Sequence, residues 1–301
     1  MKFKVFSKIR FFFLIYSVMI FSACHDSDKI EPEYGERTVL IYMAADNNLN
    51  KDGETNIKSI LKGMEQTAGR LVIYIDPRYD VPRLLTVKGG KGCRLDTLET
   101  YTEENSASPE VLARVVKEVQ KRYPASSYGL VLWSHGLGWV PPEYSFPGGY
   151  AMRLPDPDMP RTKYYAEDEH PGTTGKAYMD IREMAARLPG HFNFILWDVC
   201  FMGGIEVAYE LRNKTDYMIA SPAEVISDGF PYEKIVPLFW GGEEAMKQIC
   251  REYYNHYNKY PVNSLWRSAV VGLVKTEELE PLAAKVRTLL AGKTDYARAW
   301  H

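Results

Sequence analysis

The chain has 301 residues, 46% of them hydrophobic and 25% charged, which is enough to bury one sizeable core or at most two small ones. Its net charge of -2 comes without a concentrated basic face, so the sequence predicts no nucleic-acid partner, because phosphate binding needs such a face. Composition therefore indicates an ordinary globular protein, and its function has to be inferred from its motifs.

The N-terminal segment 1–24 has the pattern of a bacterial secretory signal. A basic stretch is followed by an almost wholly apolar run over 11–21 and by the small pair Ser22-Ala23. Small residues that end at Cys24 resemble a lipobox, in which this cysteine becomes the lipidated first residue of the mature protein. A transmembrane anchor is the alternative, but the apolar run is too short to span a membrane comfortably. We therefore expect a signal peptide, a polar tether over 25–37, and an exported lipoprotein at the cell envelope.

The remainder of the chain, 38–301, alternates strand-like and helix-like segments. The expected strands are 38–45, 70–76, 128–134, 193–197, 216–220 and 268–274. The expected helices are 49–66, 109–123, 179–188, 204–211, 243–259 and 277–291. A β-hairpin over 82–101, turned by the glycine-rich residues 89–92, interrupts the alternation. The pattern predicts an α/β fold with a mostly parallel central sheet of about six strands, helices on both faces and an added hairpin.

Residues 141–176 form the longest stretch without clear periodicity, rich in proline and glycine. We expect an exposed loop that emerges beside His135. Loops of this length are usually functional or disordered, and a mobile insertion without a role is the alternative.

Cysteine usage is compatible with a functional thiol. If Cys24 is lipidated, Cys93, Cys200 and Cys250 remain, which is an odd number for an exported protein. At least one thiol therefore stays free or pairs outside the chain. Two isolated thiols at Cys93 and Cys250 are favoured over a disulfide between them, because nothing in the sequence demands the bond.

Two of the expected strands end in reactive side chains. The run 130–136 (LVLWSHG) ends at His135, and the run 194–200 (FILWDVC) ends at Cys200. Because the carboxyl ends of parallel strands meet at one edge of a sheet, the sequence predicts a thiol–imidazole pair. The backbone amides of Gly136 and Cys200 are then placed to hold the oxyanion of a tetrahedral intermediate.

Other chemistries lack their motifs. The sequence has no G-x-S-x-G elbow, Walker loop, H-E-x-x-H or paired C-x-x-C, and its six histidines are scattered without metal-ligand spacing. We therefore expect no metal site and no required cofactor.

At these residues the sequence resembles the clostripain family of caspase-like (clan CD) cysteine peptidases. The matching motifs are 38–49 (TVLIYMAADNNL), 135–139 (HGLGW), 198–202 (DVCFM) with Glu206, and 221–232 (SPAEVISDGFPY). They occur in the family's order over roughly 38–290. The resemblance implies a caspase-like three-layer sandwich and a cysteine endopeptidase.

The resemblance also assigns roles to individual residues. His135 and Cys200 would be the catalytic dyad, with no third acidic member required, and cleavage would follow Arg or Lys. Asp198 and Asp228 would line the specificity pocket, because a buried carboxylate facing a guanidinium gives a charge-assisted pair. The alternatives are a structural hydrogen bonder for Asp198 and a turn residue for Asp228. We expect Asp46 to be a helix cap rather than a catalytic residue.

Several features depart from the family pattern. Val199 and Phe201 are bulkier than the usual alanine and leucine beside the nucleophile. The loop 141–176 is cleaved during self-activation in some relatives, and the basic residues available for such cleavage here are Arg153, Arg161, Lys163 and Lys176. Relatives are expected to continue beyond His301, so the domain is expected to be shortened. Calcium is suggested by the resemblance alone, since no acidic loop has a cation-site pattern.

Three functions remain open at this stage. The favoured one is an envelope cysteine endopeptidase, a monomer acting on proteins or peptides with basic residues and attached to the membrane through its N-terminal lipid. The second is a catalytically inactive relative that binds peptides or partners through the same groove. The third, a sheet that binds a small anionic ligand, lacks a phosphate loop.

Overall fold

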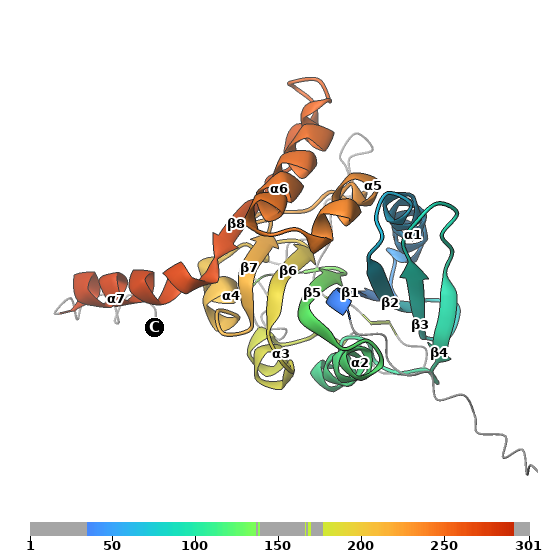
Figure 1. Ribbon diagram of the computed structural model, residues 1–301. Helices are drawn as coiled ribbons and strands as arrows, with labels where there is room; N and C mark the ends of the chain where they lie inside the picture. The colour runs from blue at the N-terminus through green and yellow to red at the C-terminus, as the bar shows by residue number, and fades with distance from the viewer. Residues whose placement is uncertain (1–34, 137, 139–165, 167, 170–176, 292–301) are drawn as a thin grey trace, which may run out of the picture. The chain divides into compact units, whose positions relative to one another are not determined.

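The computed structural model describes residues 35–136, 138, 166, 168–169 and 177–291. All of them belong to one compact unit. Eight strands in this part form a single sheet in the order β4-β3-β2-β1-β5-β6-β7-β8 (Figure 1). The strands are β1 (Gly35–Ala45), β2 (Arg70–Pro77), β3 (Arg83–Lys88), β4 (Asp96–Thr100), β5 (Ala125–Trp133), β6 (Phe192–Asp198), β7 (Thr215–Ala220) and β8 (Gly272–Lys275).

The central strands are parallel and the outer ones antiparallel. β2, β1, β5, β6 and β7 pair in parallel, whereas β3 and β4 at one edge and β8 at the other pair in antiparallel. β1 is buried at every position from Thr38 to Ala45, which explains its uninterrupted apolar sequence, because a strand covered on both faces has no solvent side.

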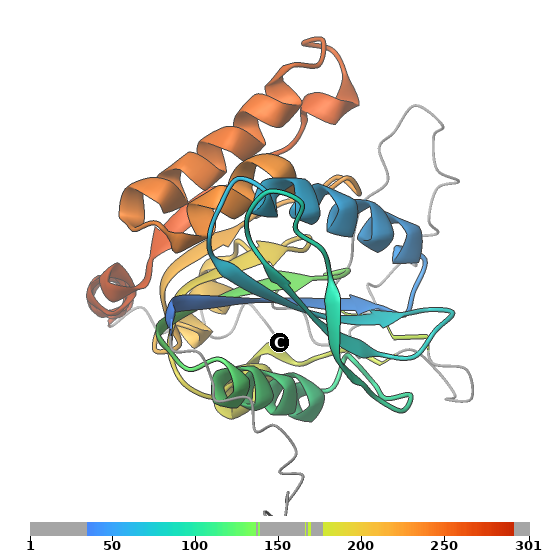
Figure 2. The same ribbon diagram turned by 45° about the vertical axis from the view of Figure 1, so that its right-hand side comes forward.

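Helices cover both faces of the sheet (Figure 2). They are α1 (Asn50–Met64), α2 (Pro109–Arg122), α3 (Ile181–Arg187), α4 (Ile205–Glu210), α5 (Tyr232–Ile235), α6 (Glu243–Asn258) and α7 (Leu279–Leu290). One apolar layer joins the sheet to α2, α3 and α4 through side chains such as Leu112, Met184 and Val207. The other joins it to α1, α5 and α6 through side chains such as Ile60 and Met246. The expected three-layer α/β sandwich is confirmed.

Most expected elements are present, with shifted ends. The hairpin forms β3 and β4 and extends the sheet beside β2. β1 begins at Gly35, inside the expected tether, and the expected strand 268–274 is reduced to β8, which starts at Gly272. The four-residue helix α5 was not expected, because so short a segment shows no helical periodicity.

Cys93 and Cys250 are both free thiols, as expected. Burial raises the pKa of the Cys250 thiol to about 11. The expected signal peptide 1–24, most of the expected tether and most of the loop 141–176 lie outside the described residues.

Candidate active site

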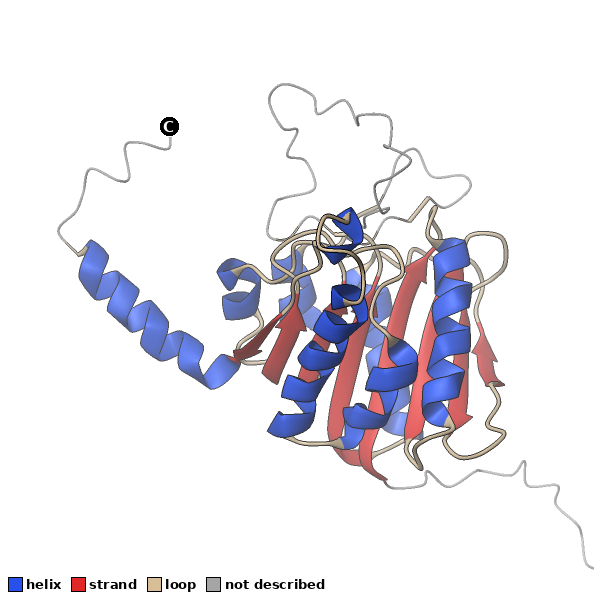
Figure 3. Ribbon diagram, turned by 90° about the horizontal axis from the view of Figure 1, so that it is seen from above, coloured by secondary structure: helices blue, strands red, loops and turns tan. Residues whose placement is uncertain are grey.

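The register between two neighbouring strands brings His135 and Cys200 to the same edge of the sheet. β5 and β6 are parallel, with Trp133 paired to Asp198, and His135 and Cys200 each lie two residues beyond that pair. The parallel strands run toward one edge of the sheet (Figure 3). Neighbouring strands of a sheet are usually about 4.8 Å apart. Both side chains are buried, with exposures of 3% for His135 and 0% for Cys200.

The loops that follow the two strands also touch. Gly138 has a φ of +69°, and a Cβ built on it would lie 2.7 Å from the carbonyl oxygen of Phe201. Only glycine allows this close approach of the histidine loop to the residue after Cys200. Phe201 itself has a φ of +61°, a conformation that costs a non-glycine residue about 1–3 kcal/mol. Its amide donates to the Ala223 carbonyl at 2.9 Å, which holds this tight turn in place.

The imidazole of His135 is held by Asn48. The His135 Nε2 atom lies 2.6 Å from Asn48 Oδ1. Because an amide oxygen only accepts, Nε2 carries the hydrogen of this bond and Nδ1 of the neutral ring is left able to take a proton. Asn48 belongs to the turn after β1, the strand on the other side of β5, and the turn is fixed by Asn47, whose Oδ1 accepts from the Leu49 amide at 2.9 Å.

The sulfur of Cys200 lies against the segment that follows β7. The Val225 amide donates to Cys200 Sγ at 3.2 Å, and the thiol reaches the Val225 carbonyl at 3.7 Å. The first contact favours the thiolate, which is the nucleophilic form, whereas the second, in which the thiol donates, favours the neutral thiol. The same segment is tied to the nucleophile turn by the Gly203 amide, which donates to the Ser221 carbonyl at 2.7 Å.

Asp198 is fully buried at the end of β6 and connects the nucleophile strand to the segment before α5. Its Oδ2 accepts a hydrogen bond from the Tyr232 hydroxyl at 2.9 Å and another from the Phe230 amide at 3.4 Å. Gly229 packs so closely that a Cβ built on it would lie 2.4 Å from the same oxygen. Burial and the neighbouring Asp198 carboxylate raise the pKa of Tyr232 well above its usual value. These contacts give Asp198 a structural task, and its role in a specificity pocket stays a prediction.

Asp228 lies next to this segment with its side chain exposed. Its main-chain carbonyl accepts a hydrogen bond from Asn56 Nδ2 at 3.1 Å. The backbone of Asp228 is therefore held while its carboxylate is open to solvent.

A group of buried carboxyls lies near the ends of β1 and β2. Asp46 does not cap α1, because the residue before that helix is Leu49 and no side chain caps it. Instead, burial and the nearby Asp168 raise the pKa of Asp46 to about 7. Burial likewise raises the pKa of Asp76, at the end of β2, to about 8. The prediction for Asp46 was wrong because a tertiary contact, rather than the local turn, decides its surroundings.

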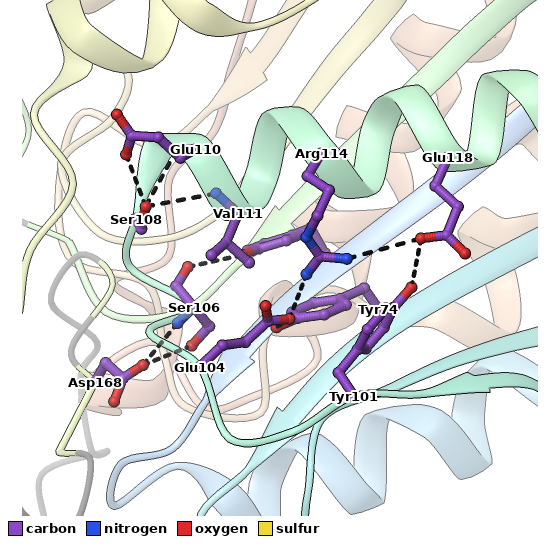
Figure 4. Close-up of polar contacts among 11 residues, drawn as sticks. Tyr74, Tyr101, Glu104, Ser106, Ser108, Glu110, Val111, Arg114, Glu118 and Asp168 are labelled. Atoms are coloured by element: carbon purple, nitrogen blue, oxygen red, sulfur yellow. Dashed lines mark hydrogen bonds and ion pairs between the residues drawn. The ribbon is translucent and has the colours of Figure 1, made fainter.

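The carboxyl of Asp168 anchors a described part of the long loop 141–176. Its Oδ2 accepts from the Ser106 amide at 2.7 Å and from the Ser106 hydroxyl at 3.2 Å (Figure 4). Glu169 donates its amide to the Asp46 carbonyl at 2.8 Å and pairs with Arg78 at 2.6 Å. Local sequence patterns do not reveal this anchor, because its partners are far apart along the chain.

Within the ranges that the structure describes, no group of three or more His, Cys, Asp or Glu side chains could hold a metal ion. The calcium suggested by the family resemblance stays a prediction, and no step of the proposed chemistry passes through a metal.

Comparison with known proteins agrees with this geometry. The model of the clostripain family matches residues 41–295. Clostripain of Hathewaya histolytica is 26% identical over 228 residues, which are 66% of this chain and 41% of clostripain, so the chain spans less than half the length of that relative.

Two solved structures resemble the fold described above. A secreted C11 cysteine protease from Bacteroides thetaiotaomicron, in complex with an irreversible peptide inhibitor, superposes with a TM-score of 0.70 at 32% identity, covering 85% of this chain and 71% of that one. An inactive zymogen C11 protease from Parabacteroides distasonis has a TM-score of 0.68 at 36% identity, covering 87% and 68% respectively. With the family model matching most of its length, the chain belongs to the clostripain family.

Proposed function

We propose that this chain is a cysteine endopeptidase that cuts peptide bonds after Arg or Lys through His135 and Cys200. The observation that carries the proposal is the parallel register of β5 and β6, which sets both residues two positions beyond a paired Trp133 and Asp198. Family membership and the two protease structures support it.

The chemistry follows from the two side chains. The Cys200 thiol gives its proton to Nδ1 of His135, and the thiolate attacks the carbonyl carbon of the scissile bond. The oxyanion of the tetrahedral intermediate accepts hydrogen bonds from the Gly136 and Cys200 amides. As the intermediate collapses, the imidazolium returns the proton to the leaving amine and a thioester remains. A water molecule, deprotonated by His135, then releases the acid and restores the thiol.

Asn48 acts through His135 in this scheme. Its amide oxygen keeps the hydrogen on Nε2 and fixes the ring plane. Nδ1 is thereby kept as the basic atom through each turnover.

Asp198 and Asp228 are the proposed source of the preference for a basic side chain. Asp228 is exposed and can meet an arriving guanidinium or ammonium group directly. Asp198 is proposed to contribute negative charge from the buried end of β6. Its hydrogen bonds with the Phe230 amide and the Tyr232 hydroxyl hold its carboxyl in place.

Self-activation by cleavage within 141–176 is part of the proposal. A similar chain is described as an inactive zymogen, and the basic residues Arg153, Arg161, Lys163 and Lys176 of this protein are the cleavage sites to examine. They lie outside the described residues. Purified protein should yield two fragments on incubation, whereas Cys200→Ala should stay intact, and an unchanged wild type would argue against self-processing.

Export with lipidation at Cys24 is proposed from the sequence and from a relative that is described as secreted. In the part of the chain that the structure describes, no helix is both long and apolar enough to cross a membrane. Metabolic labelling with a fatty acid should mark the wild type and leave Cys24→Ala unlabelled.

The activity is tested with fluorogenic peptides that carry Arg, Lys, Asp or Ala before the cleavage site. We expect turnover of the Arg and Lys peptides only, and none by Cys200→Ala. Silence with every peptide, even after limited proteolysis, would contradict the peptidase and favour a binding module.

A further inference from the structure

Asn56 is a buried polar side chain on the apolar face of α1. It is 4% exposed and shares that face with Gly53, Ile60, Gly63 and Met64. Burying an amide is unfavourable unless its groups are hydrogen-bonded, and here both ends of the amide have partners.

The two partners fix the orientation of the amide. Asn56 Oδ1 accepts from the Trp133 indole N–H at 2.7 Å, and Asn56 Nδ2 donates to the Asp228 carbonyl at 3.1 Å. An indole N–H only donates and a carbonyl only accepts, so the oxygen and nitrogen of Asn56 cannot exchange places.

These partners belong to the two halves of the proposed site. Trp133 is the last residue of β5, two residues before His135, and pairs with Asp198 of the nucleophile strand. Asp228 carries the exposed carboxylate proposed to meet the basic side chain of the substrate. One buried side chain on α1 therefore connects the strands of the dyad to the main chain of Asp228.

Neighbouring contacts support the same segment. The Tyr257 hydroxyl donates to the Gly229 carbonyl at 2.7 Å, and the Glu233 amide donates to Ser59 Oγ on α1 at 3.0 Å. These two bonds reach Gly229 and Glu233, whereas the bond from Asn56 reaches the main-chain carbonyl of Asp228 itself. Since the side chain of Asp228 is exposed, the position of its carboxylate depends on how its backbone is held.

We infer that Asn56 is a positioning residue for substrate selection, which fixes the Asp228 carboxylate at a set place relative to His135 and Cys200. The inference rests on the proposed cleavage after Arg or Lys. A charge-assisted pair is strong only in good geometry, and a displacement of about 1 Å can cost about a hundredfold in rate. Asn56 acts through Asp228 and needs no contact with the substrate.

The test compares Asn56→Leu, which has a similar shape and loses both hydrogen bonds, with Trp133→Phe. The second variant loses the indole bond and leaves a smaller ring in the core, but it keeps the bond from Asn56 to the Asp228 carbonyl. Each enzyme is assayed on two peptides that carry Arg or its neutral isostere citrulline before the scissile bond. We expect Asn56→Leu to raise KM for the Arg peptide about tenfold, leaving the citrulline peptide and the rate of Cys200 alkylation by iodoacetamide within about twofold. Trp133→Phe should lower Tm and keep the wild-type preference for Arg.

An unchanged KM for the Arg peptide in Asn56→Leu would overturn the inference. The inference would also be overturned if Asn56→Leu lost as much activity on the citrulline peptide as on the Arg peptide, or if its Cys200 were alkylated about tenfold more slowly. A loss of the preference for Arg in Trp133→Phe as large as in Asn56→Leu would overturn it as well. If Asn56→Leu does not fold, Asn56→Ser replaces it, because its hydroxyl is too short to reach both partners. A wild type that cleaves no Arg or Lys peptide would instead refute the proposed function, so the two failures are distinguishable.

Discussion

Replacing Asn48 by alanine removes the acceptor that holds the His135 ring. The bond measures 2.6 Å, and it carries charge when His135 becomes an imidazolium during the reaction. Hydrogen bonds to charged groups contribute about 1.5–3 kcal/mol. Since about 1.4 kcal/mol is a factor of ten in rate, Asn48→Ala should lower kcat/KM for an Arg peptide about 10- to 100-fold. Asn48 is exposed, so Tm should change little.

The assay is kcat/KM against pH, with the active enzyme counted by titration of Cys200. Asn48→Asp also accepts from Nε2 and should restore activity. The negative charge of the new aspartate favours the imidazolium form of His135. The part of the kcat/KM–pH profile that depends on His135 should therefore move to higher pH. Asn50→Ala is the matched control, because Asn50 Oδ1 accepts from the Arg78 main-chain amide and not from His135. The reasoning is refuted if Asn48→Ala keeps kcat/KM within twofold of the wild type, or if Asn50→Ala loses as much.

Three further changes test other parts of the structure. Asp76 has a pKa of about 8 in the folded state and about 4 when unfolded, so its burial costs stability increasingly as pH rises through this range. Asp76→Asn should therefore raise the free energy of unfolding by about 4 kcal/mol at pH 7 and by less than about 0.5 kcal/mol at pH 4, and a gain independent of pH in denaturant titrations would contradict this. Tyr232→Phe removes a donor from the buried Asp198 carboxylate and should cost about 1–3 kcal/mol of stability, whereas an unchanged Tm would mean that the bond contributes nothing. Gly138→Ala forces a Cβ toward the Phe201 carbonyl and should slow alkylation of Cys200; wild-type alkylation would show that the two loops do not need this contact.

Much of the fold could be predicted, because a strand buried on both faces leaves a clear mark in the sequence. The apolar runs before His135 and Cys200 are such strands, and the end of each run marks the reactive residue. The expected strand 268–274 was too long for a tertiary reason. β7 ends at Ala220, opposite Gly272, so the residues before Gly272 have no strand to pair with.

The supporting residues of the site could not be predicted from local patterns. Asn48 and His135 are 87 positions apart, and Asn56 and Asp228 are 172 apart. These contacts depend on the order of strands in the sheet and on how α1 packs, neither of which a run of residues reveals. For Asp46, a local pattern gave a wrong prediction. Its turn suggested a helix cap, but in the fold it is a buried carboxyl near Asp168.

The central claim is that Cys200, activated by His135, attacks a peptide that carries a basic residue. An irreversible arginyl ketone inhibitor followed by intact-protein and peptide mass spectrometry tests it most directly. The wild type should gain one adduct, located on Cys200, while Cys200→Ala gains none. His135→Ala should react far more slowly, and a citrulline ketone should modify the wild type far more slowly than the arginyl ketone does. An unmodified wild type, or an adduct on Cys93 or Cys250 in place of Cys200, would contradict the account.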